Sequence, residues 1–319
     1  MRLRSTFPLL LVLVVAACGS GSDPEPPAPT PEPSVEIPPQ ETPGTDGELD
    51  LEPPPAPDDS SSPAVNSVTV DPGDGTIMVG SGPAMFIVRP GEKEGERILG
   101  VVETPEAKGT VSGNMVLRFT GPGELLANGH PRQGNLPENL PLLTSSDLGK
   151  TFEVVEGTAE ADYHELEVFG DRIFAVTVES PDIQVSSDGG KTWQTSTPPN
   201  LPIDIVVDPD DPDHWAVSTE QGTFVSTNGG QSWRPRDTSF GARLAWPAAD
   251  ALYSLDRNGK LRVSADGGEN WEDRGDVGGL PSEITTSGRK DELFVAIVGG
   301  KIRKSTNGGK TWSTAATLR

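Results

Sequence analysis

The sequence contains a single cysteine, Cys18, and is poor in basic residues. With one cysteine no disulfide can form within the chain, which excludes a disulfide-stabilised scaffold and leaves packing as the source of stability. Lys and Arg together number 25 against 48 Asp and Glu, which gives a formal net charge of −23. Because an acidic surface repels phosphate, nucleic acid is excluded as an expected partner.

The apolar run Phe7–Ala17 is too short to span a bilayer, so it predicts no transmembrane helix. It follows Arg2 and Arg4 and has the layout of a signal peptide. The run ends in Val15-Ala16-Ala17-Cys18, which resembles the lipobox of bacterial lipoproteins and implies lipidation of Cys18. An ordinary signal peptide with a chance cysteine is the alternative. We expect residues 1–18 to be a lipoprotein signal peptide and the protein to be lipid-anchored to the cell membrane, outside the cytoplasm.

Residues 19–63 lack Lys and Arg and have almost no large apolar side chains. They are rich in proline and carry eleven acidic residues. Such a segment cannot bury a core, so it predicts a disordered tether, extended by its prolines to about 3.1 Å per residue. Without this tether and the signal-peptide arginines, the rest of the chain has a formal charge of about −14.

Residues 64–319 are predicted to form one domain, and they contain five near copies of one eight-residue segment. The copies are SSDLGKTF from Ser145, SSDGGKTW from Ser186, STNGGQSW from Ser226, SADGGENW from Ser264 and STNGGKTW from Ser305. Their offsets are 41, 40, 38 and 41 residues. A period near 40 with short β-type runs between turns predicts a repeat architecture, because four strands of about six residues with their turns fill one period.

The residue types of the repeated segment predict a structural turn. The third position can accept hydrogen bonds from backbone N–H groups, and Asn does this as well as Asp. The fifth position is a glycine, which can adopt positive φ. The closing aromatic ring can pack between neighbouring repeats. Because a charge is not required at the third position, we expect a structural role for Asp147, Asp188, Asn228, Asp266 and Asn307, and for Phe152, Trp193, Trp233, Trp271 and Trp312.

These segments resemble the Asp-box or BNR repeats, S-x-D-x-G-x-T-W, of sialidase-like, sortilin-like and photosystem-assembly-factor-like β-propellers. The resemblance implies an all-β propeller of four-stranded antiparallel blades, with each box joining the third and fourth strands on the rim, away from the ligand-binding face. A segment from Asn66 repeats the pattern without a box, so we expect six blades, with seven as the alternative. Residues near Arg319 are expected to close the ring on the strand near Val68.

In a propeller, the first strand of each blade lines the channel and begins on the face where the loop between the second and third strands emerges. The longest such loop, Asn128–Pro141, carries His130 and Arg132, and the next blade begins with Asp162, Tyr163, His164 and Glu165. We therefore expect His130 and His164 to converge at one rim of the channel. Alignment of the first strands places six residues at equivalent positions: Ser67, Val116, Glu165, Asp204, Arg243 and Glu283.

Each of these groups has a structural alternative. Histidines near carboxylates can ligate a metal, but His130 can equally lock its loop, and we predict no metal and no cofactor. The charged ring is either an internal girdle of salt bridges or a ligand site. Trp246 either fills core or stacks on a sugar, and the acidic run Asp208–Asp213 is either a calcium site or a tight turn.

Two functions fit this domain. One is non-catalytic binding of a protein or glycan by a monomer, with His130, Arg132, Asp162, His164 and Arg243 as candidate ligand-binding residues. The other is glycoside hydrolysis, because ANGHP (127–131) and ADYHEL (161–166) resemble a group of bacterial Asp-box lipoproteins labelled glycosylhydrolases or sialidase-like.

A sialidase would need a tyrosine nucleophile with a glutamate, an arginine clamp and an acid. The chain has only two tyrosines, and the stretch Phe86-Ile87-Val88-Arg89-Pro90 departs from the sialidase Phe/Tyr-Arg-Ile-Pro order, so Arg89 is not assigned to the clamp. If the protein is an enzyme, its candidate catalytic residues are Tyr163, Glu165, Asp204 and Glu283. We favour binding over catalysis.

Overall fold

The computed structural model describes residues 65–319, except 83, 178, 179 and 239, and all of these belong to one compact unit. The predicted signal peptide, the lipobox residue Cys18 and the tether 19–63 lie outside the described residues. The prediction of an all-β fold is confirmed, because the described residues form strands β1 to β27 and no helix. Among them there is accordingly no α-helix with the length and apolarity that crossing a membrane requires.

The strands pair into six antiparallel units of four strands each, called here sheets 1 to 6. Sheet 1 comprises β1 (Val65–Val70), β2 (Ile77–Ser81), β3 (Met85–Val88) and β4 (Glu94–Ile98). Sheet 2 comprises β7 (Val116–Gly121), β8 (Glu124–Asn128), β10 (Leu143–Ser145) and β11 (Thr151–Val154). Sheet 3 comprises β12 (Tyr163–Phe169), β13 (Arg172–Thr177), β14 (Ile183–Ser186) and β15 (Gln194–Ser196). Sheet 4 comprises β16 (Pro202–Asp208), β17 (Asp211–Thr219), β18 (Gly222–Ser226) and β19 (Arg234–Asp237). Sheet 5 comprises β20 (Arg243–Ala245), β21 (Leu252–Leu255), β22 (Lys260–Ser264) and β23 (Glu272–Asp276). Sheet 6 comprises β24 (Pro281–Thr286), β25 (Leu293–Ile297), β26 (Lys301–Ser305) and β27 (Ser313–Leu318).

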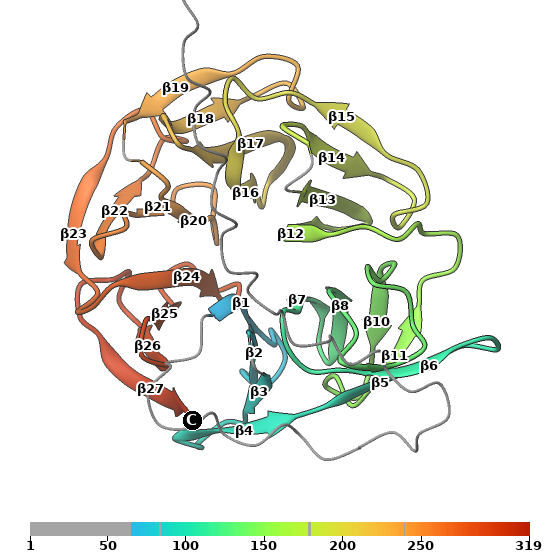
Figure 1. Cartoon of the computed structure of the whole chain (residues 1–319). Helices are drawn as coiled ribbons and strands as arrows, with labels where there is room; N and C mark the ends of the chain where they lie inside the picture. The colour runs from blue at the N-terminus through green and yellow to red at the C-terminus, as the bar shows by residue number, and fades with distance from the viewer. Residues whose placement is uncertain (1–64, 83, 178–179, 239) are drawn as a thin grey trace, which may run out of the picture. The chain divides into compact units, whose positions relative to one another are not determined.

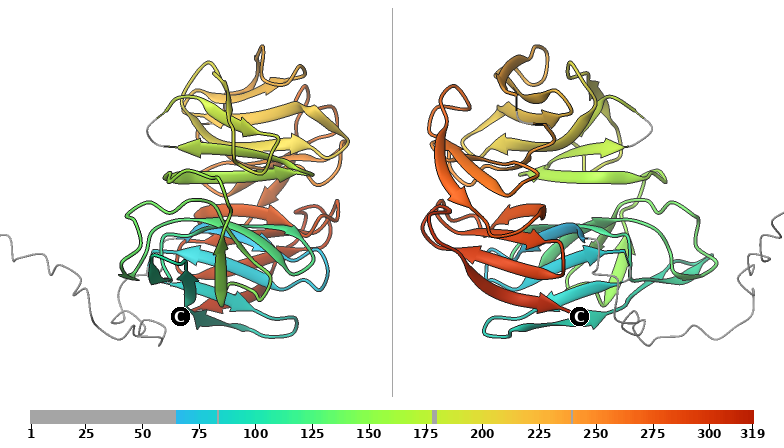
Figure 2. Two further views of the ribbon diagram at one scale, coloured as in Figure 1. Left: turned by 90° about the vertical axis from the view of Figure 1, so that its right-hand side faces the viewer. Right: turned by 60° about the vertical axis from the view of Figure 1, so that its left-hand side comes forward.

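The six sheets form a closed ring around a central axis (Figure 1). The first strand of each sheet lies nearest the axis, and it contacts the first strand of the sheet before it and of the sheet after it. The circle closes where β24 of sheet 6 contacts β1 of sheet 1. Neighbouring sheets therefore face one another around the ring (Figure 2).

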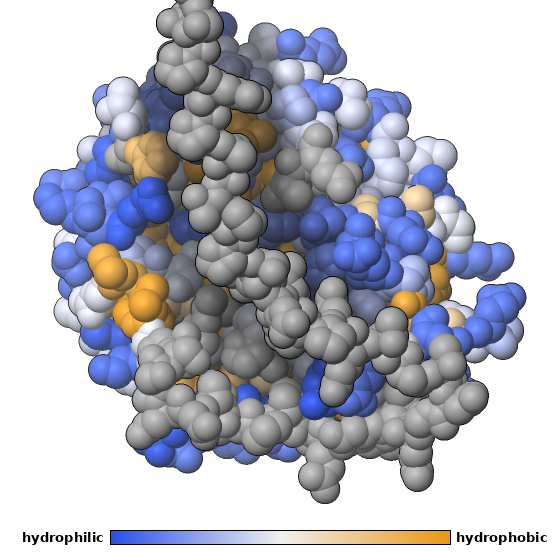
Figure 3. Space-filling model, in the orientation of Figure 1, coloured by the Kyte–Doolittle hydropathy of each residue, from blue (hydrophilic) through white to orange (hydrophobic). Residues whose placement is uncertain are grey.

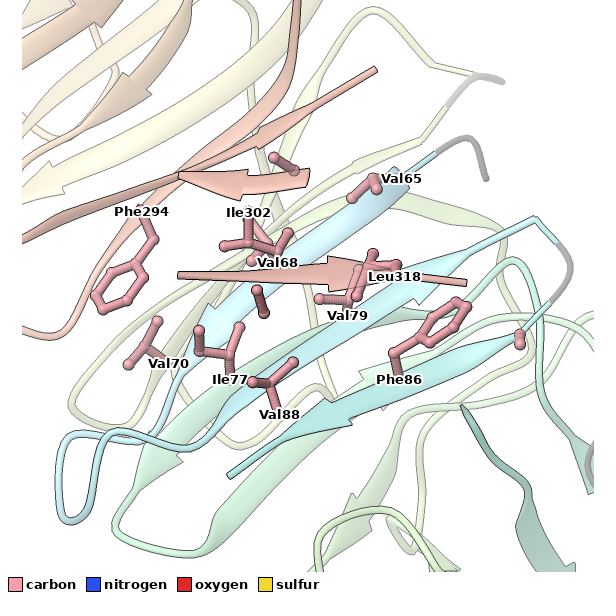
Figure 4. Packing of buried hydrophobic residues seen from close by; sticks show 13 residues of the cluster. Val65, Val68, Val70, Ile77, Val79, Phe86, Val88, Phe294, Ile302 and Leu318 are labelled. Carbon is pink, nitrogen blue, oxygen red and sulfur yellow. The ribbon is translucent and has the colours of Figure 1, made fainter. Parts of the chain in front are cut away.

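Inner strands are apolar on both sides because each sheet is covered on both faces. All residues of β2 and β25 are buried, whereas the fourth strands β15 and β23 are largely exposed. Figure 4 shows the packing of sheet 1 against sheet 6, where Val68 and Phe86 lie in one cluster with Ile302. Complete burial of each such side chain contributes roughly 1.5–3 kcal/mol.

The ring closes through outer strands as well as inner ones. Strand β27 pairs in parallel with β4, with Thr317 opposite Glu94, and Arg97 Nε donates to the Arg319 carbonyl at 2.7 Å. The prediction that residues near Arg319 meet the strand near Val68 is therefore wrong. The last strand is an outer strand, so its partner is the outer strand of sheet 1.

A hairpin that was not predicted joins sheets 1 and 2. It consists of β5 (Gly100–Glu103) and β6 (Lys108–Val111). Strand β5 pairs in parallel with β11, and β6 pairs with the short strand β9 (Gln133–Gly134) in the long loop of sheet 2. The hairpin thus covers the outer edge of sheet 2, the kind of exposed edge that invites pairing with another chain, and anchors the loop that carries His130.

All five Asp-boxes lie between the third and fourth strands of sheets 2 to 6. In each, the first serine Oγ accepts a hydrogen bond from the N–H of the fifth-position glycine, at 2.7–2.9 Å. Asp188 Oδ1 also accepts from the N–H of Thr192 at 2.9 Å, and Asn228 Oδ1 accepts from the N–H of Ser232 at 3.0 Å. The five glycines have φ between 76° and 90°. Asp and Asn therefore make the same turn.

Substitutions of Asp188 test whether the Asp-box needs the hydrogen-bond acceptor at its third position or the negative charge. Asp188→Asn keeps the acceptor for the Thr192 N–H, so we expect a melting temperature close to that of the wild type. Asp188→Ala removes that acceptor and lowers the melting temperature by several degrees. Thermal unfolding of the two variants side by side tests this. An equal decrease in melting temperature for both would show that the carboxylate charge matters.

Gly230→Ala should destabilise the protein more than Gly189→Ala. Both glycines have positive φ, at which an alanine costs about 1–2 kcal/mol. At Gly230 the added Cβ would also clash with Ser196 Oγ and the Trp215 ring, whereas nothing lies within 4 Å of one at Gly189. Overpacking adds roughly 1–3 kcal/mol. Urea unfolding measures the difference, and equal losses for the two variants would contradict the packing at Gly230.

Candidate functional site

Two adjoining cavities open on the face where the first strands begin. One, of about 560 Å³, is lined by Asn66, His130, Asp162 and His164 among others, and the second, of about 490 Å³, is lined by residues that include Phe240, Asp256 and Arg257. The two share Val65, Ile203 and Arg243. We call these two cavities the mouth.

At the axis, charged side chains from five first strands form a connected set. Arg118 Nη2 of β7 lies 2.5 Å from Glu165 Oε1 of β12, and 3.4 Å from Glu167 Oε2. Arg243 Nη2 of β20 lies 2.9 Å from Glu283 Oε1 of β24, and its Nη1 lies 3.9 Å from Glu165 Oε2. Asp204 of β16 interacts electrostatically with Arg243 and Arg118. We call these residues the hub network: Arg118, Glu165, Glu167, Asp204, Arg243 and Glu283.

Equivalent hydrogen bonds support the alignment of four of the first strands, β1, β7, β16 and β20. The Leu117 N–H donates to Ser67 Oγ at 3.1 Å, and the Leu244 N–H donates to Asp204 Oδ2 at 2.8 Å. In both cases the acceptor stands at the aligned position of its strand. The donor is the backbone N–H one residue after the aligned position of the next first strand, Val116 or Arg243. Ser67 and Asp204 are therefore equivalent.

Arg118 is the member of the hub network that the sequence analysis missed. The alignment gave Val116 as the residue of sheet 2, whereas Arg118 lies two residues further along β7 and so on the same face. Its Nε also donates to the Leu166 carbonyl at 2.7 Å. With Arg118 and Glu167 included, two guanidinium groups face four carboxyl groups.

Burial dominates the protonation of this network. It raises the pKa of Glu165 well above its usual value and that of Glu283 to about 7, with Arg118 and Arg243 respectively opposing part of the shift. Burial likewise raises the pKa values of Glu167 and Asp204. Burial therefore shifts the pKa values of all four acids upward, and the two guanidinium groups oppose the shift.

The hub network lies between the mouth and a third cavity. That cavity, of about 240 Å³, is lined by Arg118, Glu167, Asp204, Glu283 and by Trp246. Trp246 is only 6% exposed and its ring contacts that of His214 edge-on at 4.7 Å between centroids. Its packing is that of a core residue.

Two histidines converge at the mouth, as the loop lengths predicted. His130 Nε2 lies 3.3 Å from Asp162 Oδ1, and His164 Nε2 lies 3.4 Å from the same oxygen. His130 Nδ1 lies 3.0 Å from the Glu138 carbonyl within its own loop. His130 therefore holds both its loop and the start of sheet 3.

No metal site accompanies these histidines in the part of the chain that the structure describes, where no three His, Cys, Asp or Glu residues are arranged to hold an ion. The acidic run Asp208–Asp213 forms a tight turn instead. In it the Asp210 N–H donates to Asp208 Oδ1 at 2.9 Å, and Asp208 Oδ2 lies 3.1 Å from His214 Nδ1.

Asn128 positions the histidines, although the sequence analysis did not single it out. It is fully buried at the end of β8. Its Nδ2 donates to the Leu140 carbonyl at 2.7 Å, and its Oδ1 accepts from the Tyr163 N–H at 3.1 Å. One side chain thus fixes both ends of the long loop and the first residue of β12.

The residues of a sialidase site are not brought together. The Tyr163 ring packs among buried apolar residues at 5.5 Å from the Trp193 ring, and burial raises its pKa to about 12, which disfavours a nucleophilic phenolate. Arg132 does not line the mouth, and its N–H donates to the Thr110 carbonyl on β6. Arg89 pairs with Glu96 at 2.5 Å on sheet 1. The mouth cavity beside Tyr163 is lined by one arginine, Arg243.

Comparison with known proteins identifies the repeat and the fold. The family model for the BNR/Asp-box repeat matches residues 184–195. None of the curated proteins matches the chain. The GH74 enzyme of Niastella koreensis is similar in structure at 15% sequence identity and a TM-score of 0.53, over 81% of this chain and 46% of that one. This chain therefore spans about half the length of that enzyme.

Two other similar structures have lower TM-scores. YCF48 from Cyanidioschyzon merolae is 14% identical with a TM-score of 0.45, over 82% of this chain and 86% of that one. A YCF48 bound to a D1 peptide is 17% identical with a TM-score of 0.46, over 84% and 87% of the two chains. Together with the matched repeat, the likeness to the GH74 enzyme shows an Asp-box-repeat protein with a β-propeller fold.

The pKa of Glu283 predicts a pH dependence of stability. A carboxyl group whose pKa rises from 4.5 to about 7 on folding stabilises the folded state below pH 4.5, and this contribution is lost as the pH rises to 7. The other hub carboxyls shift in the same direction. We expect stability to fall between pH 4.5 and 7 and the fall to be shallower in Glu283→Gln. Urea unfolding across this range tests it, with exposed Glu156→Gln as the control; an unchanged slope in Glu283→Gln would contradict it.

Proposed function

We propose that the chain is a binding protein that holds a protein or glycan ligand at the mouth and catalyses no reaction on it. The observation that carries this proposal is the contrast between the mouth and the hub network. Two cavities are open at the mouth, whereas the candidate catalytic carboxyls Glu165, Asp204 and Glu283 are 4–7% exposed and held within the network. Their geometry suits a girdle that joins the sheets at the axis.

We further propose that the six sheets are the blades of a six-bladed propeller, displayed outside the cytoplasm on a lipidated Cys18. The sequence motif around Cys18 and the acidic, proline-rich composition of residues 19–63 support an anchor and a spacer. Val65, the first described residue, lines both cavities of the mouth.

Glycoside hydrolysis is the second candidate function, and one observation favours it. A general acid needs a raised pKa, and Glu283 has one near 7 while it lines the third cavity together with Asp204. The likeness to a GH74 enzyme adds only an analogy of fold. Against it, Glu283 is paired with Arg243 at 2.9 Å.

The two functions are separated by testing the mature chain for turnover and for binding. On a panel of chromogenic glycosides and on xyloglucan we expect no hydrolysis above the buffer rate. Hydrolysis that Glu283→Gln or Glu165→Gln abolishes would establish the enzyme and overturn the proposal.

In the binding arm, the mature chain is applied to a glycan array and to immobilised envelope proteins. We expect a ligand whose retention drops at least tenfold in Asp162→Lys, because this change reverses a charge in the mouth. Glu156→Lys, the same change at an exposed site that does not line the mouth, should leave retention unchanged. Equal effects of the two variants would locate binding away from the mouth.

A further inference from the structure

Exposed apolar side chains border the mouth on the side of sheets 4 to 6. Only four large apolar side chains among the described residues are well exposed: Leu201 at 48%, Phe240 at 45%, Leu280 at 58% and Val298 at 58%. Leu201 and Phe240 line the mouth, and Leu280 precedes Pro281, which also lines it. Val298 lies beside Leu280, because its N–H donates to the Leu280 carbonyl at 2.8 Å. We call these four residues the apolar arc.

The repeat places three members of the arc at equivalent positions on consecutive sheets. Each precedes the aligned hub residue of its sheet by three positions: Leu201 before Asp204, Phe240 before Arg243 and Leu280 before Glu283. In sheet 3 the equivalent residue is the acidic Asp162. Figure 3 shows apolar surface gathered beside β24 and β25. Exposed apolar groups collected on one face of an acidic domain are typical of an interaction surface.

Proline and arginine neighbours hold the arc in place. Leu201 and Leu280 each precede a proline, which restricts their backbones to extended conformations. The Arg257 guanidinium lies over the Phe240 ring, with its Cζ 4.9 Å from the ring centroid. Side chains fixed before binding lose less conformational entropy when a ligand covers them.

We propose that the apolar arc docks an extended polypeptide segment that carries aliphatic or aromatic side chains next to basic ones. This inference rests on the proposed function, since it names the ligand class of the same mouth. The cavity beside Phe240 is lined by two carboxylates, Glu220 and Asp256, and by two guanidinium groups, Arg243 and Arg257. Arg243 is paired with Glu283, and residues 64–319 carry a formal charge of about −14, so basic groups on the partner are favoured.

The composition of the arc favours a polypeptide over a glycan or a bilayer. Sugars stack on open aromatic faces, but Phe240 is the one aromatic member of the arc and Arg257 already covers one face of its ring. Anionic bilayers repel a domain of this charge. Apolar side chains spaced along an extended segment match apolar groups repeated from sheet to sheet.

The test presents the mature chain with an array of synthetic 12-residue peptides in three classes: apolar with basic residues, apolar with acidic residues, and polar. We expect preferential retention of the first class. Leu201→Ser combined with Leu280→Ser should weaken retention of this class at least tenfold, because two of the four apolar side chains of the arc are removed. Glu220→Lys should weaken basic peptides more than acidic ones. Gln194→Ser, an exposed change on the outer strand β15, is the control.

Thermal unfolding first establishes that each variant is folded, and Leu280→Lys provides a second, single-site disruption of the arc. Retention of polar or acidic peptides only, or retention that the arc variants leave unchanged, would overturn the proposal. So would arc-dependent binding to vesicles of phosphatidylcholine and phosphatidylglycerol without peptide binding. Binding to a glycan array that depends on Asp162, without peptide binding, would overturn the proposed polypeptide ligand but leave the proposed binding function standing. If the chain bound no peptide, glycan or envelope protein, the proposed function would be overturned as well.

Discussion

The structure depends on one constraint: each four-stranded sheet has two apolar faces and cannot bury either by itself. Neighbouring sheets cover both, so a sheet is stable only within a complete ring. This explains why β2 and β25 are buried on both sides, and why Phe86 of sheet 1 shares a cluster with Ile302 of sheet 6, far apart in the sequence. It also explains the parallel pairing of β27 with β4, since the ring must close where the chain ends.

In a ring of this kind, side chains at the rim and side chains at the axis make different kinds of contact. At the rim, the Asp-boxes hold the third and fourth strands by contacts within eight residues, so their sequence is repeated. At the axis, the first strands converge and their side chains meet residues from other repeats, so the sequence differs from sheet to sheet. Arg118 contacts Glu165 of the next sheet, and Arg243 contacts Glu283 of the next. Such pairs favour one order of sheets around the axis.

What could be predicted from the sequence follows this division. The boxes were predicted because the hydrogen bonds that form their turns are local. The aligned first-strand positions were predicted because the repeat has a regular period. Arg118 was missed because its partners, Glu165, Leu166 and Glu167, belong to another sheet and are distant in the sequence. No sequence signal indicated the register shift between Tyr163 and Glu165 in the pairing of β12 with β13, which lets Tyr163 enter the core while Glu165 reaches the hub network. Arg132 was misplaced because β9 pairs its loop with the unpredicted hairpin.

The same register shift recurs before Asp204 and Glu283, and it links the interior of the ring to its surface. After each shift a charged side chain points to the axis, and three residues before it Leu201 or Leu280 is exposed beside the mouth. The hub network lies between the mouth and the third cavity, while the segments that supply its charges also present the exposed apolar groups. A ligand at the mouth meets the ends of these segments and not the buried carboxyls. For this reason the geometry supports recognition at the surface more strongly than chemistry within the channel.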